Sequence, residues 1–246
     1  MLLEANKMKN ILSYHSYDRG WILLLLVLIL LISSRNVQAH IPLDTDVAAT
    51  REVPIVVEDH KISWAAYSQL AEAEDVEYYR FTAEAGEEIF AEMLVPVLGR
   101  LENFIPDFAL IGPGLENDYD GLNREEVETR LDIREGEGVI VRGYYQEESE
   151  VFREHFTQTS YWRRQQDTIT APEAGVYYLA VFSRENATGK YVLAIGREEK
   201  WGARDIARMP KIWWDVRIFM EQERSTYAIT ALLGAGALYL ITRLIK

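Results

Sequence analysis

The chain has 246 residues, 48% of them hydrophobic, which is enough for one sizeable core with appended segments. It contains no cysteine, so a disulfide framework and thiolate catalysis are excluded, and any metal would have to bind histidine and carboxylate ligands. Its formal charge of −13 argues against a nucleic-acid partner, because phosphate binding requires a basic surface.

The first 39 residues have the pattern of an export signal. A basic start precedes a run of 12 apolar residues from Trp21 to Ile32, and Val37-Gln38-Ala39 fits the small-x-small cleavage rule. A run of this length suits a signal peptide better than a membrane span, which needs roughly 20 residues. We therefore predict a signal peptide over 1–39 that leaves His40 as the mature N-terminus. An uncleaved anchor is the alternative, and both place the body outside the cytoplasm.

The next segment, residues 40–52, is polar and is predicted to be a linker. Residues 53–199 then show roughly eight short strand patterns separated by Gly, Pro and Asn turns, with no helical period. The stretches 115–138 and 146–166 between these strands are expected to be irregular. This pattern predicts an all-β fold, an antiparallel β-sandwich.

The clearest strand pattern is residues 75–95, which predict a β-hairpin turning at Ala85-Gly86. Along its second strand apolar residues alternate in period two, at Ile89, Ala91, Met93 and Val95. The hairpin cannot bury this face alone, so a second sheet must cover it. A second hairpin is expected over residues 168–196.

Five stretches of the segment resemble the bacterial pre-peptidase C-terminal (PPC) domain family. They are KISWAAYSQL, DVEYYRFTAEAGEEIFAEM, DFALIGPG, TAPEAGVYYLAVF and GKYVLAIG. The resemblance covers about residues 55–196 in the family's order, with an enlarged middle section over 115–166. It implies a jelly-roll-like antiparallel β-sandwich, of the kind appended to secreted enzymes as an accessory or binding module.

Two helices are predicted after the sandwich. Residues 201–222 have apolar positions at helical spacing and three tryptophans, which indicates an amphipathic juxtamembrane helix on a bilayer surface or, alternatively, packed on the sandwich. Residues 225–245 are predicted to be one transmembrane helix, with Arg243 and Lys246 placing the C-terminus in the cytoplasm. The expected topology is a single-pass membrane protein whose N-terminal domain lies outside the cytoplasm and whose partner is the lipid bilayer.

Two stretches suggest metal ligands. Glu116, Asp118 and Asp120 match the first half of an EF-hand calcium loop, although the closing glutamate is displaced by one position. A solvated acidic loop is the alternative. His40, as the mature N-terminus, could bind copper through its amino group and imidazole, with an exposed terminal histidine as the alternative.

The run Tyr161-Trp162-Arg163-Arg164 mixes aromatic rings with guanidinium groups, a combination that suits binding of a partner protein or a glycan. These aromatics could equally be core residues. No Ser-His-Asp order, paired-carboxylate motif or phosphate loop is present in the sequence, so an enzyme is not expected, nor a cofactor apart from the calcium considered above.

The predicted function is a non-enzymatic, membrane-anchored interaction module that binds a partner protein or glycan. The alternative is an accessory subunit of a membrane enzyme complex, docked through small residues of the last helix between Ala231 and Gly236. A calcium- or copper-binding ectodomain is a further possibility.

Overall fold

The computed structural model describes residues 40–146 and 148–244. The description below concerns these residues. The predicted signal peptide, residues 1–39, lies outside the described residues.

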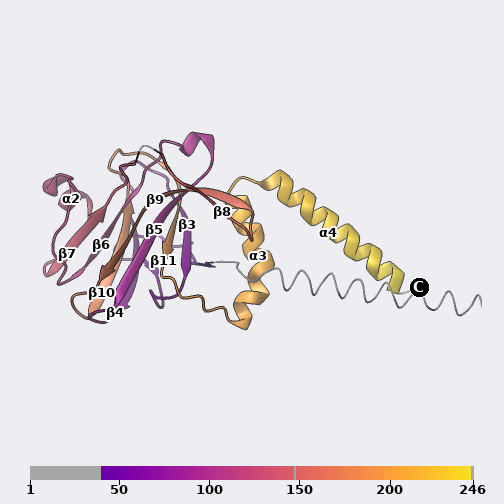
Figure 1. The fold of residues 1–246 in the computed structure, drawn as a ribbon, viewed down its shortest axis with the longest axis horizontal. Helices are drawn as coiled ribbons and strands as arrows, with labels where there is room; N and C mark the ends of the chain where they lie inside the picture. Colours follow the sequence, from indigo (N-terminus) through magenta and orange to yellow (C-terminus); the bar gives the residue numbers. More distant parts are fainter. Residues whose placement is uncertain (1–39, 147, 245–246) are drawn as a thin grey trace, which may run out of the picture. The chain divides into compact units, whose positions relative to one another are not determined.

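Eleven strands of the described part form two sheets that pack face to face as a β-sandwich (Figure 1). The six-stranded sheet has the spatial order β1 (Ile41–Pro42), β3 (Trp64–Leu70), β11 (Gly189–Ile195), β5 (Glu88–Pro96), β9 (Thr159–Thr170) and β8 (Val151–Glu154). The five-stranded sheet has the order β2 (Ile55–Val56), β4 (Glu77–Ala83), β10 (Gly175–Phe182), β6 (Asp107–Pro113) and β7 (Glu137–Arg142). Only the short strands β1 and β2 pair in parallel, so the predicted antiparallel β-sandwich is confirmed at this level.

The predicted hairpin over residues 75–95 is wrong in its pairing. Its two strands exist, but β4 pairs with β2 and β10, whereas β5 pairs with β9 and β11 in the opposite sheet. The turn at Gly86, whose φ is 87°, carries the chain from one sheet to the other. The second expected hairpin fails in the same way, because β10 and β11 also lie in different sheets. The alternation of apolar residues predicts which side chains of a strand face the core, but it does not determine which strand lies next to it.

The main core fills the space between the two sheets. Its largest fully buried side chains include Tyr79, Phe81 and Phe108 from one sheet and Met93 and Tyr191 from the other. The Tyr79 and Tyr191 hydroxyl oxygens lie 2.7 Å apart, so a hydrogen bond joins the sheets inside the core. Two tyrosine hydroxyls are thereby buried without loss of hydrogen bonding.

The enlarged middle section is more regular than predicted. The acidic stretch contains a short helix, α2 (Arg124–Arg130), and residues 146–166 form β8 and much of β9. The Asn123 side chain caps α2 by accepting a 2.9 Å hydrogen bond from the Glu125 amide. Val127 and Leu131, four residues apart, pack with Val139 and Val141 on the outer face of the five-stranded sheet. A seven-residue helix is too short to show a helical period in sequence.

The helix α3 (Ala203–Phe219) covers the outer face of the six-stranded sheet. Ile212 and Val216 of α3, with Met220 just after it, pack against a patch of this sheet that includes Leu94 and Tyr161. Of the two alternatives for residues 201–222, the structure therefore shows packing on the sandwich. The packing of α3 on this sheet also explains why the side chains on both faces of β5 are buried.

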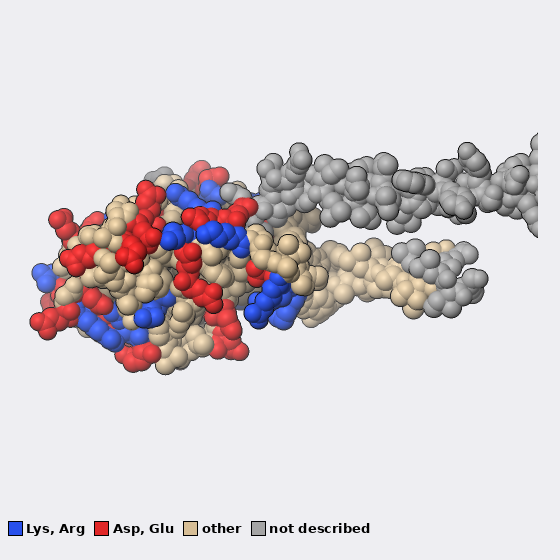
Figure 2. Space-filling model, turned by 90° about the horizontal axis from the view of Figure 1, so that it is seen from below, with Lys and Arg blue, Asp and Glu red and all other residues tan. Residues whose placement is uncertain are grey.

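The last helix, α4 (Glu223–Leu244), covers the segment predicted to cross a membrane. Its large apolar side chains are exposed, with Leu232 at 75%, Leu233 at 67% and Leu238 at 63%. In Figure 2, charged side chains are interspersed over the sandwich and absent from most of the visible length of α4. Within residues 40–146 and 148–244, however, no helix is long and apolar enough to cross a membrane. This finding does not support the prediction of a transmembrane helix over 225–245, of which residue 245 lies outside the described residues.

Candidate functional site

A β-bulge in β9 creates the most distinctive polar site of the described chain. Glu92 of β5 is opposite Gln166 of β9, and Leu94 is opposite Arg163, so Arg164 and Gln165 share one position of the partner strand. Such bulges redirect side chains and are frequent beside binding sites. Around this point lies a cavity of about 460 Å³, which we call the bulge site. Its lining includes Glu92, Arg142, Tyr144, Tyr145, Glu150, Arg163, Arg164 and Gln165.

Two arginines of the bulge site are matched by carboxylates. Arg142 donates to Asp118 at 2.7 Å and to Asp167 at 2.5 Å, and the Arg163 Nε lies 3.4 Å from Glu92 Oε1. Burial raises the pKa of the Glu92 carboxyl, while Arg163 opposes this effect. In the cavity wall, burial thus opposes the charged form of the Glu92 carboxyl and Arg163 favours it.

Arg164 has no carboxylate partner among the described residues. Its Nη2 donates to the carbonyl oxygens of Glu102 at 2.7 Å and Phe104 at 3.1 Å, and its Nη1 donates to the Ser149 hydroxyl. Its guanidinium carbon lies 5.5 Å from the ring centre of Tyr144. Burial lowers the pKa of Arg164, and its Nε is buried without a hydrogen-bond acceptor. The bulge site therefore carries a guanidinium whose charge and hydrogen-bonding capacity are only partly satisfied.

Gln165 supplies the complementary group, an unpaired acceptor. Its side chain is only 8% exposed, and its Nε2 donates to the carbonyl oxygens of Pro106 at 2.8 Å and Arg142 at 3.2 Å. These bonds fix the amide, yet its Oε1 is buried without a donor. The Gln165 amide is thus fixed through its nitrogen, beside Arg164 at the bulge.

The four residues predicted to bind a partner are divided by the structure. Arg163 and Arg164 line the bulge site. Tyr161 is 2% exposed and lies under α3, where its hydroxyl accepts a 2.9 Å hydrogen bond from Thr159. Trp162 is half-buried against the core between the sheets. These two aromatics are core residues because both faces of β9 are covered at this point. The local sequence does not predict that α3 covers one of these faces.

The predicted calcium ligands bind protein donors. Asp118 accepts hydrogen bonds from the Asp120 amide at 3.1 Å and from Arg142, and both contacts lower its pKa. Asp120 accepts from the Gly143 amide at 2.7 Å, and Glu116 is exposed. No group of three or more His, Asp or Glu side chains in the described residues is arranged to hold a metal ion. The acidic loop instead contacts Arg142 and Gly143, at the end of β7 that leads into the bulge site.

His40, the predicted copper ligand, is engaged with a serine. Its Nδ1 lies 2.5 Å from the Ser63 hydroxyl, and burial lowers the pKa of the imidazole. Ser63 is itself only 6% exposed, which leaves little room for a substrate at this Ser–His pair. The geometry is that of a structural contact that fixes the start of the sandwich.

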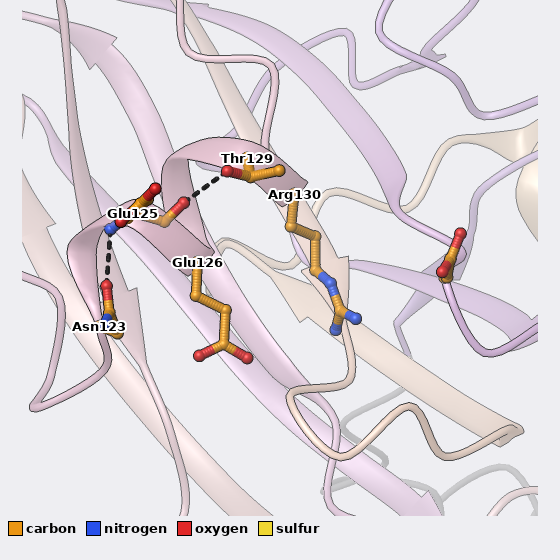
Figure 3. Close-up of a pocket in the computed structure, with 6 residues that line it drawn as sticks. Asn123, Glu125, Glu126, Thr129 and Arg130 are labelled. Carbon is orange, nitrogen blue, oxygen red and sulfur yellow. Dashed lines mark hydrogen bonds between the residues drawn. The ribbon is translucent and has the colours of Figure 1, made fainter.

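A second cavity, of about 650 Å³, lies beside α2 and was not expected from sequence. Figure 3 shows Asn123 capping the helix and the side chains of Glu126 and Arg130 extending from it. Arg130 donates to the Ser183 carbonyl and to the Asn186 side chain. Because its one cation is already engaged and α2 has only seven residues, this cavity is a less defined site than the one at the bulge.

Comparison with known proteins finds only distant structural similarities. No family model matches the chain, and no curated protein matches it. Among solved structures, the periplasmic inhibitor of g-type lysozyme from Salmonella Typhimurium is 19% identical, with 57% of this chain and 94% of that chain covered and a TM-score of 0.31. The corresponding inhibitor from Aeromonas hydrophila is 12% identical, with the same coverage and a TM-score of 0.32.

A copper-binding protein is similar to the same extent. CorA, a surface-associated copper-binding protein of Methylomicrobium album BG8, is 8% identical, with 59% of this chain and 98% of that chain covered and a TM-score of 0.28. At these identities and TM-scores, none of these proteins defines the family or the function of this chain.

Proposed function

We propose that the chain is a non-enzymatic extracytoplasmic binding module that holds a glycan in the bulge site. The observation that carries the proposal is the β-bulge, which brings Arg163, Arg164 and Gln165 into the lining of one cavity together with Tyr144 and Tyr145. Guanidinium and amide groups beside aromatic rings suit a hydroxyl-rich ligand, because a hydroxyl group both donates and accepts hydrogen bonds.

The size and charge of the bulge site support a ligand of this kind. Its volume of about 460 Å³ falls within the range of small-ligand sites. Three arginines and three carboxylates line it, so their formal charges balance and a neutral ligand is favoured. Tyr145, which is 62% exposed, offers an aromatic ring at the rim. An accessory binding role also agrees with the expectation drawn from the resemblance to the PPC family.

We further propose that α4 attaches the module to a lipid bilayer. The support is the exposure of Leu232, Leu233 and Leu238, since large apolar surfaces left open to water mark contacts with membranes or partners. Flotation of the full-length chain with phospholipid vesicles tests this attachment. A chain that remains at the bottom of the gradient would contradict it.

The glycan proposal is tested with the full-length chain on a glycan array, followed by calorimetric titration of the best ligand. Replacing Arg164 by Met keeps much of the aliphatic stem and removes the donors, so affinity should fall about tenfold, the effect of one lost charged hydrogen bond. The matched control is Arg153→Met, an exposed arginine on β8 outside the cavity, which should bind as the wild type does. Equal losses in both variants, or no glycan bound at all, would overturn the proposal.

A protein partner is the second candidate, because β8 is the outermost strand of its sheet and exposes Val151 at 56%. An unpaired strand edge can accept a strand from another protein. Mild-detergent extraction with cross-linking and mass spectrometry separates the candidates. A stoichiometric partner lost in Val151→Asp favours the protein, including the subunit of a membrane complex considered from sequence.

A further inference from the structure

A groove of about 420 Å³ separates the first described residues from α3, and we call it the α3 groove. Its apolar lining comes from Leu43 on one side and from Ile212, Val216 and Phe219 on the other. Tyr67 of β3 also lines it, with its ring 5.5 Å from that of Phe219 in an edge-to-face arrangement. The α3 groove is thus an apolar slot attached to the sandwich.

The two walls of the α3 groove carry opposite charges. Asp44 and Asp46 lie on the wall formed by the first described residues, and Arg208 and Lys211 lie on the wall formed by α3. Lys211 forms an ion pair with Asp215 of its own helix at 2.5 Å, whereas Arg208 has no ion-pair partner in the described part of the chain. No ion pair joins the two walls within that part. Asp215 lines the groove as well, so the α3 wall carries two cations and one carboxylate, whereas the opposite wall carries two carboxylates and no cation.

The exposed helix α4 begins close to the end of this groove. Phe219 lines the groove and Glu223 begins α4, and the rings of Trp214 and Tyr227 lie 5.5 Å apart across the corner. The α3–α4 corner is also held by the Arg217 side chain, which donates to Thr226 at 2.9 Å. A bilayer reached through α4 is therefore approached from the Phe219 end of the groove, with Arg208 and Lys211 towards its other end.

We infer that the α3 groove binds the zwitterionic headgroup of a phospholipid. Arg208 and Lys211 are placed to contact its phosphate, and Asp44 and Asp46 its ammonium group, since each wall attracts the group of opposite charge. The glycerol and the first acyl methylenes would cover Ile212 and Phe219. The inference rests on the membrane attachment proposed for α4, because that attachment brings the lipid to the groove.

The test uses the purified full-length chain and short-chain lipids below their micelle concentration, so that binding does not require a bilayer. Dihexanoyl phosphatidylethanolamine should bind at least about tenfold more tightly than dihexanoyl phosphatidylglycerol, which lacks the ammonium group. Arg208→Glu should abolish this binding, and Asp44→Asn with Asp46→Asn should remove the preference between the two lipids. The controls are Arg204→Glu, an exposed arginine one turn earlier on α3, and Glu58→Gln, an exposed acid outside the groove.

Each outcome distinguishes this inference from the proposed attachment. If the wild type floats with vesicles but binds neither lipid, or binds both equally, the headgroup inference fails and the attachment stands. If Arg204→Glu weakens binding as much as Arg208→Glu, the effect is general electrostatics and the inference fails. If the ethanolamine lipid binds in the groove but the chain does not float, the attachment through α4 is the part that is wrong.

Discussion

Arg217 Nη1 of α3 donates a 2.7 Å hydrogen bond to the carbonyl oxygen of Thr157, in the turn between β8 and β9. The same guanidinium donates to Thr226 at 2.9 Å and to Ser225 at 2.6 Å, both in α4. It is 4% exposed and has no carboxylate partner among the described residues. One buried side chain therefore ties together the β8–β9 hairpin and the corner between the last two helices.

We expect Arg217→Met to destabilise the chain by about 3 kcal/mol, because two buried acceptors, on Thr157 and Thr226, and the exposed Ser225 hydroxyl lose a charged donor at once. Urea denaturation measures the loss, and hydrogen exchange should show faster opening of α4. Arg204→Met, an exposed arginine of the same helix, is the control and should leave stability unchanged. Wild-type stability in Arg217→Met would show that the corner is held by apolar packing alone.

Gly112 of β6 is expected to tolerate no side chain. A Cβ atom there would lie 2.2 Å from the Tyr177 Cδ1, inside the core between the sheets. Gly112→Ala should therefore lower stability by about 2 kcal/mol through overpacking. Gly99→Ala is the matched control, since no atom lies within 4 Å of its Cβ position. Thermal melting of both variants decides the matter, and equal melting temperatures would contradict the packing described here.

The Glu92 carboxyl should make stability depend on pH in a defined direction. Burial is the largest effect on its pKa and raises it, Arg163 and Arg197 lower it, and Glu150 raises it. A raised pKa in the folded state means that the stability contributed by Glu92 is fully present below its unfolded pKa, about 4.3, and is lost as pH rises through the folded value. Glu92→Gln has no carboxyl group to ionise, so it should not lose this stability as the pH rises.

The difference in melting temperature, Glu92→Gln minus wild type, should accordingly be more positive at pH 7 than at pH 4. Glu88→Gln, at the exposed start of the same strand, serves as the control and should show no such difference. If Glu92→Gln is instead more damaging at pH 7, the ion pair between Glu92 and Arg163 outweighs the cost of burying the carboxylate.

Calcium should not stabilise the acidic loop. The Asp120 carboxylate accepts the Gly143 amide hydrogen bond at 2.7 Å, and Asp118 is paired with Arg142, so both act on protein donors. Asp120→Ala should cost about 1 kcal/mol for the lost acceptor, equally in millimolar calcium and in chelator. A melting temperature that rises with calcium in the wild type and not in Asp120→Ala would restore the EF-hand interpretation.

Strand positions could be predicted from sequence because alternation is local. Ile89, Ala91, Met93 and Val95 all lie in the core between the sheets, as their period of two indicated. Strand partners could not be predicted, because β4 and β5 are joined by a short turn whether they pair or cross between sheets. The burial of Leu94 could not be predicted from the local sequence either, since the helix that covers it comes more than one hundred residues later.

The candidate site was predictable in part. Arg163 and Arg164 were recognised as guanidinium groups suited to a ligand, and both line the cavity. Gln165 was missed because its significance depends on the bulge, which arises from pairing with β5. Tyr161 and Trp162 were indistinguishable from surface aromatics until the cover on each face of β9 was known.

The crossing of the chain between sheets at Gly86 governs the order in which the sandwich can assemble. Because β4 cannot pair with β5, it must wait for β10, so Tyr79 meets Leu179 about one hundred positions later. β3 waits similarly for β11. Neither sheet can therefore be completed before the segment carrying β10 and β11 has been synthesised, and loop closure over such separations slows folding. The two sheets thus depend on the same late segment of the chain, and a truncation before β10 would leave both of them incomplete.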